Sequence, residues 1–93
     1  MNPFTIDVPQ ADIDDLKRRL AATRYPDEVE DAGWDYGTSI PFLRKLVEHW
    51  RTRFDWRKEE AQLNGFRRFT TELNGERVHF VHASGVGGNA TPI

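Results

Sequence analysis

FTTELNGERVHFVH, residues 69–82, alternates apolar and polar side chains on both sides of the dipeptide Asn74-Gly75. Alternation with a period of two is typical of half-buried β-strands. Asn-Gly is the preferred two-residue turn between antiparallel strands, because both positions accept a positive φ angle. The segment therefore predicts a β-hairpin.

Three helices are expected on the N-terminal side of this hairpin. The first extends from Gln10 to about Thr23, because its apolar residues recur every three or four positions. It should end there because Pro26 disfavours helical geometry at the residue that precedes it. The third is a short helix from Trp56 to Asn64.

The second helix has the clearest amphipathic pattern in the chain. Thr38 or Ser39 is a suitable N-cap, and Pro41 falls in the first turn, where a missing N–H is harmless. At 100° per residue, its apolar side chains lie within roughly 100° of one another around the helix axis. This stripe consists of Leu43, Leu46, Val47, Trp50 and Phe54.

Extended and irregular segments connect these elements. Residues 4–8 alternate apolar and polar side chains and predict a short extended arm. Residues 26–38 contain five acids and two glycines without any period, which predicts a loop. Residues 83–90 have the composition of a flexible loop, and residues 91–93 look like the first step of a third strand.

The composition is that of a small globular domain and excludes several classes of protein. Of the 93 residues, 38% are hydrophobic and 30% charged, and there is no cysteine, so disulfides, thiolate nucleophiles and cysteine-based zinc sites are excluded. No run approaches the ~18 apolar residues of a membrane helix. No signal peptide is visible, so we expect a cytoplasmic location and no membrane partner.

The charge distribution does not indicate a nucleic-acid partner. Residues 1–43 hold nine acids and four bases, whereas residues 44–93 hold nine bases and six acids, and neither imbalance is extreme. Bases and aromatic residues are interleaved over residues 50–58, as in some single-strand binders. However, Trp50 and Phe54 fall on the apolar stripe of the second helix, whereas Arg51 and Arg53 fall off it.

The residues themselves reveal no self-contained active site. His49 lies on the second helix, while His79 and His82 point to opposite faces of one strand and cannot chelate a metal together. The glycine-rich run at 85–88 lacks the following helix of a phosphate-binding loop. Neither serine has the flanking glycines of a nucleophile elbow. We therefore expect no catalytic residue, no metal site and no cofactor.

Seven short motifs follow one another along the chain: RLAATRYPD (19–27), GW (33–34), LRKLVEHWR (43–51), FDWR (54–57), EAQLN (60–64), FTTELNG (69–75) and VHFVH (78–82). Their order closely resembles the N-terminal region of microsomal-type epoxide hydrolases, a branch of the α/β-hydrolase fold that includes many bacterial members. The resemblance covers nearly the whole chain. It is carried by the set of motifs rather than by any single one.

The resemblance implies both a fold and a chemistry. The fold would be an α+β fragment of an α/β-hydrolase, with a helical N-terminal meander over residues 1–66. Residues 67–93 would supply a β-hairpin and the start of a third strand of the central sheet. In such enzymes an aspartate attacks an epoxide carbon, and water hydrolyses the resulting ester to a vicinal diol. The residues that perform this chemistry all come later than this region, so none is expected here.

The resemblance also implies a partner, which is the remainder of the hydrolase polypeptide. Trp34, Trp50 and Trp56 are candidates for the face that docks on the hydrolase core and cap, since each offers a large apolar area. The alternative for these three residues is packing among the helices of the chain itself. The alternative for the whole chain is a self-standing interaction module, which homo-oligomerises or binds a protein partner.

Overall fold

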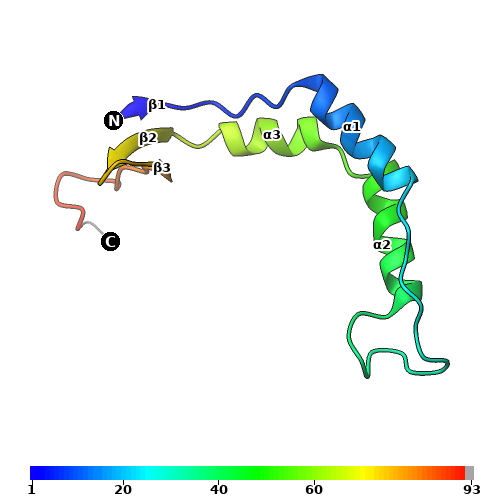
Figure 1. The fold of residues 1–93 in the computed structure, drawn as a ribbon. Helices are drawn as coiled ribbons and strands as arrows, with labels where there is room; N and C mark the ends of the chain where they lie inside the picture. Colours follow the sequence, from blue (N-terminus) through cyan, green and yellow to red (C-terminus); the bar gives the residue numbers. More distant parts are fainter. Residues whose placement is uncertain (92–93) are drawn as a thin grey trace. The chain divides into compact units, whose positions relative to one another are not determined.

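The structure is a computed structural model, and it describes residues 1–91. Figure 1 shows the elements, which in chain order are β1 (Asn2–Pro3), α1 (Gln10–Ala21), α2 (Ile40–Thr52), α3 (Trp56–Asn64), β2 (Arg68–Leu73) and β3 (Glu76–Val81). They belong to two compact units. The helical unit is Val8–Trp56, and the sheet unit joins Met1–Asp7 to the chain from Arg57 onward.

The helical unit is built from α1 and α2, which contact each other. Both helices begin where the sequence predicts. At the start of α2, the Ser39 hydroxyl accepts a hydrogen bond from the Phe42 N–H at 3.5 Å, with Pro41 in the first turn. The Glu28 carboxylate accepts a second one from the Ile40 N–H at 3.1 Å. The predicted cap at Ser39 is therefore confirmed, and the loop supplies a further acceptor.

The second helix is shorter than its apolar stripe suggested. The helix ends at Thr52, and Phe54 lies just beyond it. The N–H groups of Arg53 and Phe54 both donate to the His49 carbonyl, at 2.8 and 3.1 Å. Phe54 therefore stays next to the last turn of the helix although it is outside it.

The predicted hairpin is confirmed in the sheet unit. Strands β2 and β3 pair in antiparallel register, with Leu73 opposite Glu76 beside the turn. Asn74 and Gly75 have φ angles of 53° and 82°, the left-handed geometry for which Asn-Gly is suited. Across the strands, the ring of the buried Phe69 lies 5.8 Å from that of Phe80.

The third strand of this sheet comes from the N-terminus. Asn2 and Pro3 form β1, which pairs antiparallel with β2 opposite Thr70 and Phe69, and the strand order is β1-β2-β3. The sequence predicted an extended arm over residues 4–8, after β1, and placed a third strand at residues 91–93, of which residues 92 and 93 lie outside the described part of the chain. Strand β1 is too short to show an alternating pattern, so the sequence did not reveal it.

A side chain at the end of α3 helps to hold the arm that follows β1. The Asn64 amide forms two hydrogen bonds with the backbone of Ile6: the Ile6 N–H donates to Oδ1 at 2.9 Å, and Nδ2 donates to the Ile6 carbonyl at 2.8 Å. The side chain thus satisfies both backbone groups of Ile6, as a neighbouring strand would. The end of α3 thereby fixes the arm within the sheet unit.

From Arg57 onward, the residues of α3 belong to the sheet unit. The division into residues 1–66 and 67–93, implied by the resemblance, concerns a complete hydrolase and stays a prediction. Within residues 1–91, no helix has the length and apolar character that crossing a membrane requires.

Candidate docking surface

The apolar stripe of α2 is only partly covered in the helical unit. Leu43 and Val47 are half-buried. In contrast, Leu46 is 48% exposed, Trp50 43% and Phe54 40%. Helix α1 therefore shields one edge of the stripe and leaves the larger side chains open to solvent. Full burial of such a side chain would stabilise the folded state by roughly 1.5–3 kcal/mol. While these three side chains stay partly exposed, the chain gains only part of this free energy.

These open side chains line a groove of about 470 Å³. Its walls are apolar except for one imidazole. The apolar groove consists of Leu16, Leu46, His49, Trp50, Phe54 and Trp56. Residues of α1 and α2, the link after α2 and the first residue of α3 thus contribute to one surface, which is apolar like the centre of a protein interface.

The structure places two of the three candidate tryptophans in this groove. Trp50 comes from the last turns of α2, and Trp56, which is half-buried, comes from the first residue of α3. Trp34 lies elsewhere, in the loop before α2. Its ring contacts that of Phe42 at 5.0 Å, and the residue is 58% exposed. Docking through these residues stays a prediction, but only Trp50 and Trp56 contribute to the same surface.

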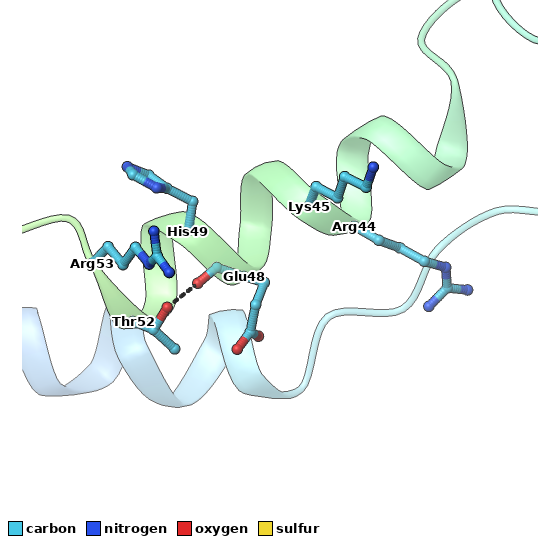
Figure 2. A pocket seen from close by; sticks show the side chains of 6 residues that line it. All are labelled: Arg44, Lys45, Glu48, His49, Thr52 and Arg53. Atoms are coloured by element: carbon cyan, nitrogen blue, oxygen red, sulfur yellow. Dashed lines mark hydrogen bonds between the residues drawn. The ribbon is translucent and has the colours of Figure 1, made fainter.

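A row of basic side chains borders the groove on α2. The basic row consists of Lys45, His49 and Arg53, which follow one another at intervals of four residues and therefore lie on one side of the helix. Together with Arg44, Glu48 and Thr52 they line an open hollow of about 570 Å³. Figure 2 shows the side chains of these six residues. Sequence reasoning missed this row, although the spacing of its three residues was visible there.

The remaining charges of α2 are occupied by local contacts. Glu48 accepts two hydrogen bonds from Arg51, at 2.9 and 3.1 Å, and this contact raises the pKa of Arg51. In Figure 2 the Glu48 carboxylate points away from Lys45 and His49. The Arg44 guanidinium lies 4.2 Å from the centre of the Tyr25 ring. Neither Glu48 nor Arg44 is therefore directed at the basic row.

On α1 the charges are paired within the helix. Asp15 forms ion pairs with Arg18 and with Arg19, the latter at 2.7 Å. The hydrogen bonds from Arg19 and Arg18 lower the pKa of Asp15 below its ordinary value. Among residues 1–91, by contrast, no carboxylate lies within ion-pair distance of Lys45 or Arg53.

The histidines of the hairpin occupy separate places. His79 lies on the side of β3 that contacts the Phe4 ring, 5.0 Å away, and its Nε2 is 3.2 Å from Nη1 of Arg68. His82 lies near Phe69, with ring centres 6.3 Å apart. Within the described residues, no group of three or more His, Asp or Glu side chains is arranged to hold a metal ion.

The fold matches the N-terminal part of solved epoxide hydrolases. The epoxide hydrolase of Aspergillus niger superposes on 86% of this chain with a TM-score of 0.79 and 35% identity, and the match occupies 22% of that protein. The juvenile hormone epoxide hydrolase of Bombyx mori gives a TM-score of 0.78 at 25% identity, with 86% and 21% covered. The expected three helices and β-hairpin are thereby confirmed, and they match the N-terminal part of epoxide hydrolase structures.

The family is also shown by sequence. Residues 1–93 match the family described as epoxide hydrolase N terminus, and the chain belongs to this family. A protein of Stigmatella aurantiaca that bears an epoxide hydrolase name is 48% identical over 93 residues, which are 100% of this chain and 21% of that protein. The chain thus spans about a fifth of the length of the curated relatives it matches.

Proposed function

We propose that the chain is the non-catalytic N-terminal segment of an epoxide hydrolase and packs on the core and cap of that enzyme. One observation carries the proposal. The same fold occurs inside a solved epoxide hydrolase chain, where it makes up 22% of the protein, whereas here the apolar groove on α2 is open. A surface of this kind calls for a partner, and the longer chain of the relatives suggests which one.

The role of the segment would be structural. Covering Leu46, Trp50 and Phe54 would stabilise the complete protein by several kcal/mol, at roughly 1.5–3 kcal/mol for each fully buried side chain. The chemistry would belong to later residues of the enzyme. There an aspartate oxygen bonds to an epoxide carbon as the ring C–O bond breaks, and water then hydrolyses the ester to a vicinal diol. We propose a cytoplasmic location for the protein.

A second candidate function is a self-standing module that homo-oligomerises through its sheet. The open edge of β3 favours it. The His82 N–H donates to the Arg67 carbonyl at 3.0 Å, so alternate residues of β3 face β2. The backbone groups of Arg77, His79 and Val81 consequently face away from β2, and such an edge can pair with another strand.

The mass of the native protein separates the two functions. An antibody against residues 1–93 isolates the protein from its own cells for intact-mass measurement. We expect about five times the 10.8 kDa of this chain, because the chain spans 21% of its Stigmatella relative. A native protein of 10.8 kDa would overturn the proposed function.

An activity assay completes the test. The longer native protein should convert styrene oxide to its diol, and the same protein without residues 1–93 should be insoluble or inactive. Residues 1–93 alone should show no turnover above a heat-treated sample. Turnover by residues 1–93 alone, or full activity after their deletion, would each contradict the proposal.

A further inference from the structure

The basic row of α2 has a position that suits the rim of an interface. Resting on the proposed function, we propose that Lys45 and Arg53 of this row bind carboxylates of the remaining hydrolase polypeptide. The row would then form the charged border of the surface whose centre is the apolar groove. The partner surface would be apolar in its middle and acidic along one side.

Continuity between groove and row is the first argument. His49 lines the apolar groove together with Trp50, and it also lines the open hollow together with Lys45 and Arg53 of the basic row. One residue therefore belongs to both surfaces, and a partner that covers the groove must come close to the row. Protein interfaces generally combine an apolar centre with a polar, more accessible rim.

The unpaired charges of the row are the second argument. Elsewhere in the helical unit, Asp15 is paired with Arg18 and Arg19, and Glu48 is paired with Arg51. Lys45 and Arg53 have no such carboxylate within residues 1–91. Opposite charges across a rim mainly determine which surface is recognised and in which register. Lys45 and Arg53, which lie at the two ends of the basic row, would thus define the orientation in which this chain docks on its partner surface.

The longer chain is a better occupant than a second copy of this chain. The loop over residues 26–38 carries five acids, which match the row in charge. A reciprocal contact between the loop of each copy and α2 of the other would close a symmetric dimer, so self-association is one outcome of the crosslinking test below. In the solved relatives the fold is instead part of one chain about five times longer.

An anionic membrane is also a poorer occupant. Each Lys or Arg near such a surface adds only a small attraction, and stable membrane binding usually needs several of them or a lipid anchor. The row contains two permanent cations, Lys45 and Arg53. Two cations suit a pair of carboxylates better than a lipid surface.

Zero-length crosslinking of the longer native protein tests the proposal directly. A carbodiimide condenses an amine with a carboxylate in ion-pair contact, forming an amide and converting the carbodiimide to a urea. Lys45 supplies the amine of the row, and the other lysines of the chain, Lys17 and Lys58, serve as internal references. We expect a bond from Nζ of Lys45 to an Asp or Glu located after residue 93. The Lys45→Arg variant keeps the charge and should lose this bond.

Three crosslinking results would overturn the proposal. The first is a Lys45 bond only to Glu48, which would show a side chain that contacts its own helix. The second is a bond to the loop over residues 26–38 in a species of doubled mass, which would assign the row to self-association. The third is the absence of any Lys45 product while Lys17 reacts.

Charge reversal provides an independent measurement. In the longer protein, Lys45→Glu combined with Arg53→Glu should speed hydrogen exchange of the α2 amides about tenfold, because exposed ion pairs are lost and repulsion replaces them. Raising NaCl from about 50 mM to about 1 M should speed exchange in the unchanged protein and slow it in the variant, because salt screens the attraction in the first and the repulsion in the second. The control Lys17→Glu, on α1, should behave like the unchanged protein. Identical exchange in all three proteins would overturn the proposal.

Vesicles of phosphatidylserine and phosphatidylcholine distinguish the membrane alternative. We expect the unchanged protein and the double variant to remain unbound after sedimentation. Binding that the double variant loses would overturn the proposal in favour of a lipid surface. Failure of the proposed function is a separate result, because it appears in the native mass and in the deletion assay rather than at Lys45.

Discussion

The sheet unit and the helical unit hold their segments in different ways. In the sheet unit, backbone hydrogen bonds join β1, β2 and β3, the Asn64 amide fixes the arm, and Phe69 is buried. In the helical unit, α1 buries Ile13 but leaves Trp50 and its neighbours exposed on α2. The comparison locates the open apolar surface: the helical unit carries the apolar groove, whereas the sheet unit buries Phe69.

The largest expected effect is on the sheet unit itself. Phe69 is 9% exposed, so Phe69→Ala should lower the free energy of unfolding by about 3–5 kcal/mol, as other truncations of buried aromatic residues do. The matched control is Phe66→Ala. Phe66 is 59% exposed, so its loss should cost below about 1 kcal/mol. Urea denaturation followed by circular dichroism measures both, and equal losses would contradict a core at Phe69.

The next effect should differ between the longer protein and residues 1–93 alone, and it therefore tests the comparison most sharply. Trp50→Ala should cost about 3 kcal/mol in the longer protein, where the groove would be covered, but about 1 kcal/mol or less in residues 1–93 alone. Trp34→Ala is the control, since Trp34 lies outside the groove and is 58% exposed. Its cost should be small in both proteins. A Trp50→Ala cost that is the same in both contexts would remove the case for docking through the groove.

A smaller effect should follow from releasing the arm. Asn64→Ala removes two hydrogen bonds to Ile6, and the expected loss is about 1–3 kcal/mol with faster hydrogen exchange at the Ile6 amide. Asn64→Asp keeps the acceptor for the Ile6 N–H but loses the donor to its carbonyl, so exchange at Ile6 should be intermediate. Gln62→Ala, an exposed position on the same helix, is the control. Unchanged exchange in Asn64→Ala would show that β1 alone holds the arm.

The smallest effect is a dependence on pH in α1. Hydrogen bonds from Arg19 and Arg18 lower the pKa of Asp15 below 3.8, so its ionised form is favoured in the folded state. The resulting stability is present above that pH and is lost as the pH falls through the lower pKa of the folded state. Asp15→Asn should reduce the loss of helix signal between neutral and strongly acidic pH, measured by circular dichroism. The Asp14 carboxylate accepts a hydrogen bond from Gln10 instead of from an arginine. The control variant Asp14→Asn should therefore show nearly the same loss of helix signal in acid as the unchanged protein.

The local elements could be predicted from the sequence because neighbouring residues determine them. The turn at Asn74-Gly75 requires left-handed backbone geometry, and the cap at Ser39 requires a hydroxyl three residues before the Phe42 N–H. Both depend on groups within a few positions of each other. For the same reason the third helix has the predicted bounds, Trp56–Asn64.

Other features depended on the tertiary structure because they join residues that are far apart in the chain. Asn2 pairs with Thr70, but a strand of two residues is too short to show a sequence pattern. Asn64 binds the backbone of Ile6, but a single asparagine does not indicate its partner in the sequence. The sequence could propose three tryptophans for docking, but only the fold brings Trp50 and Trp56 to one groove and leaves Trp34 against Phe42. Periodicity shows which side of a helix is apolar, whereas the neighbouring elements determine how much of that side is covered.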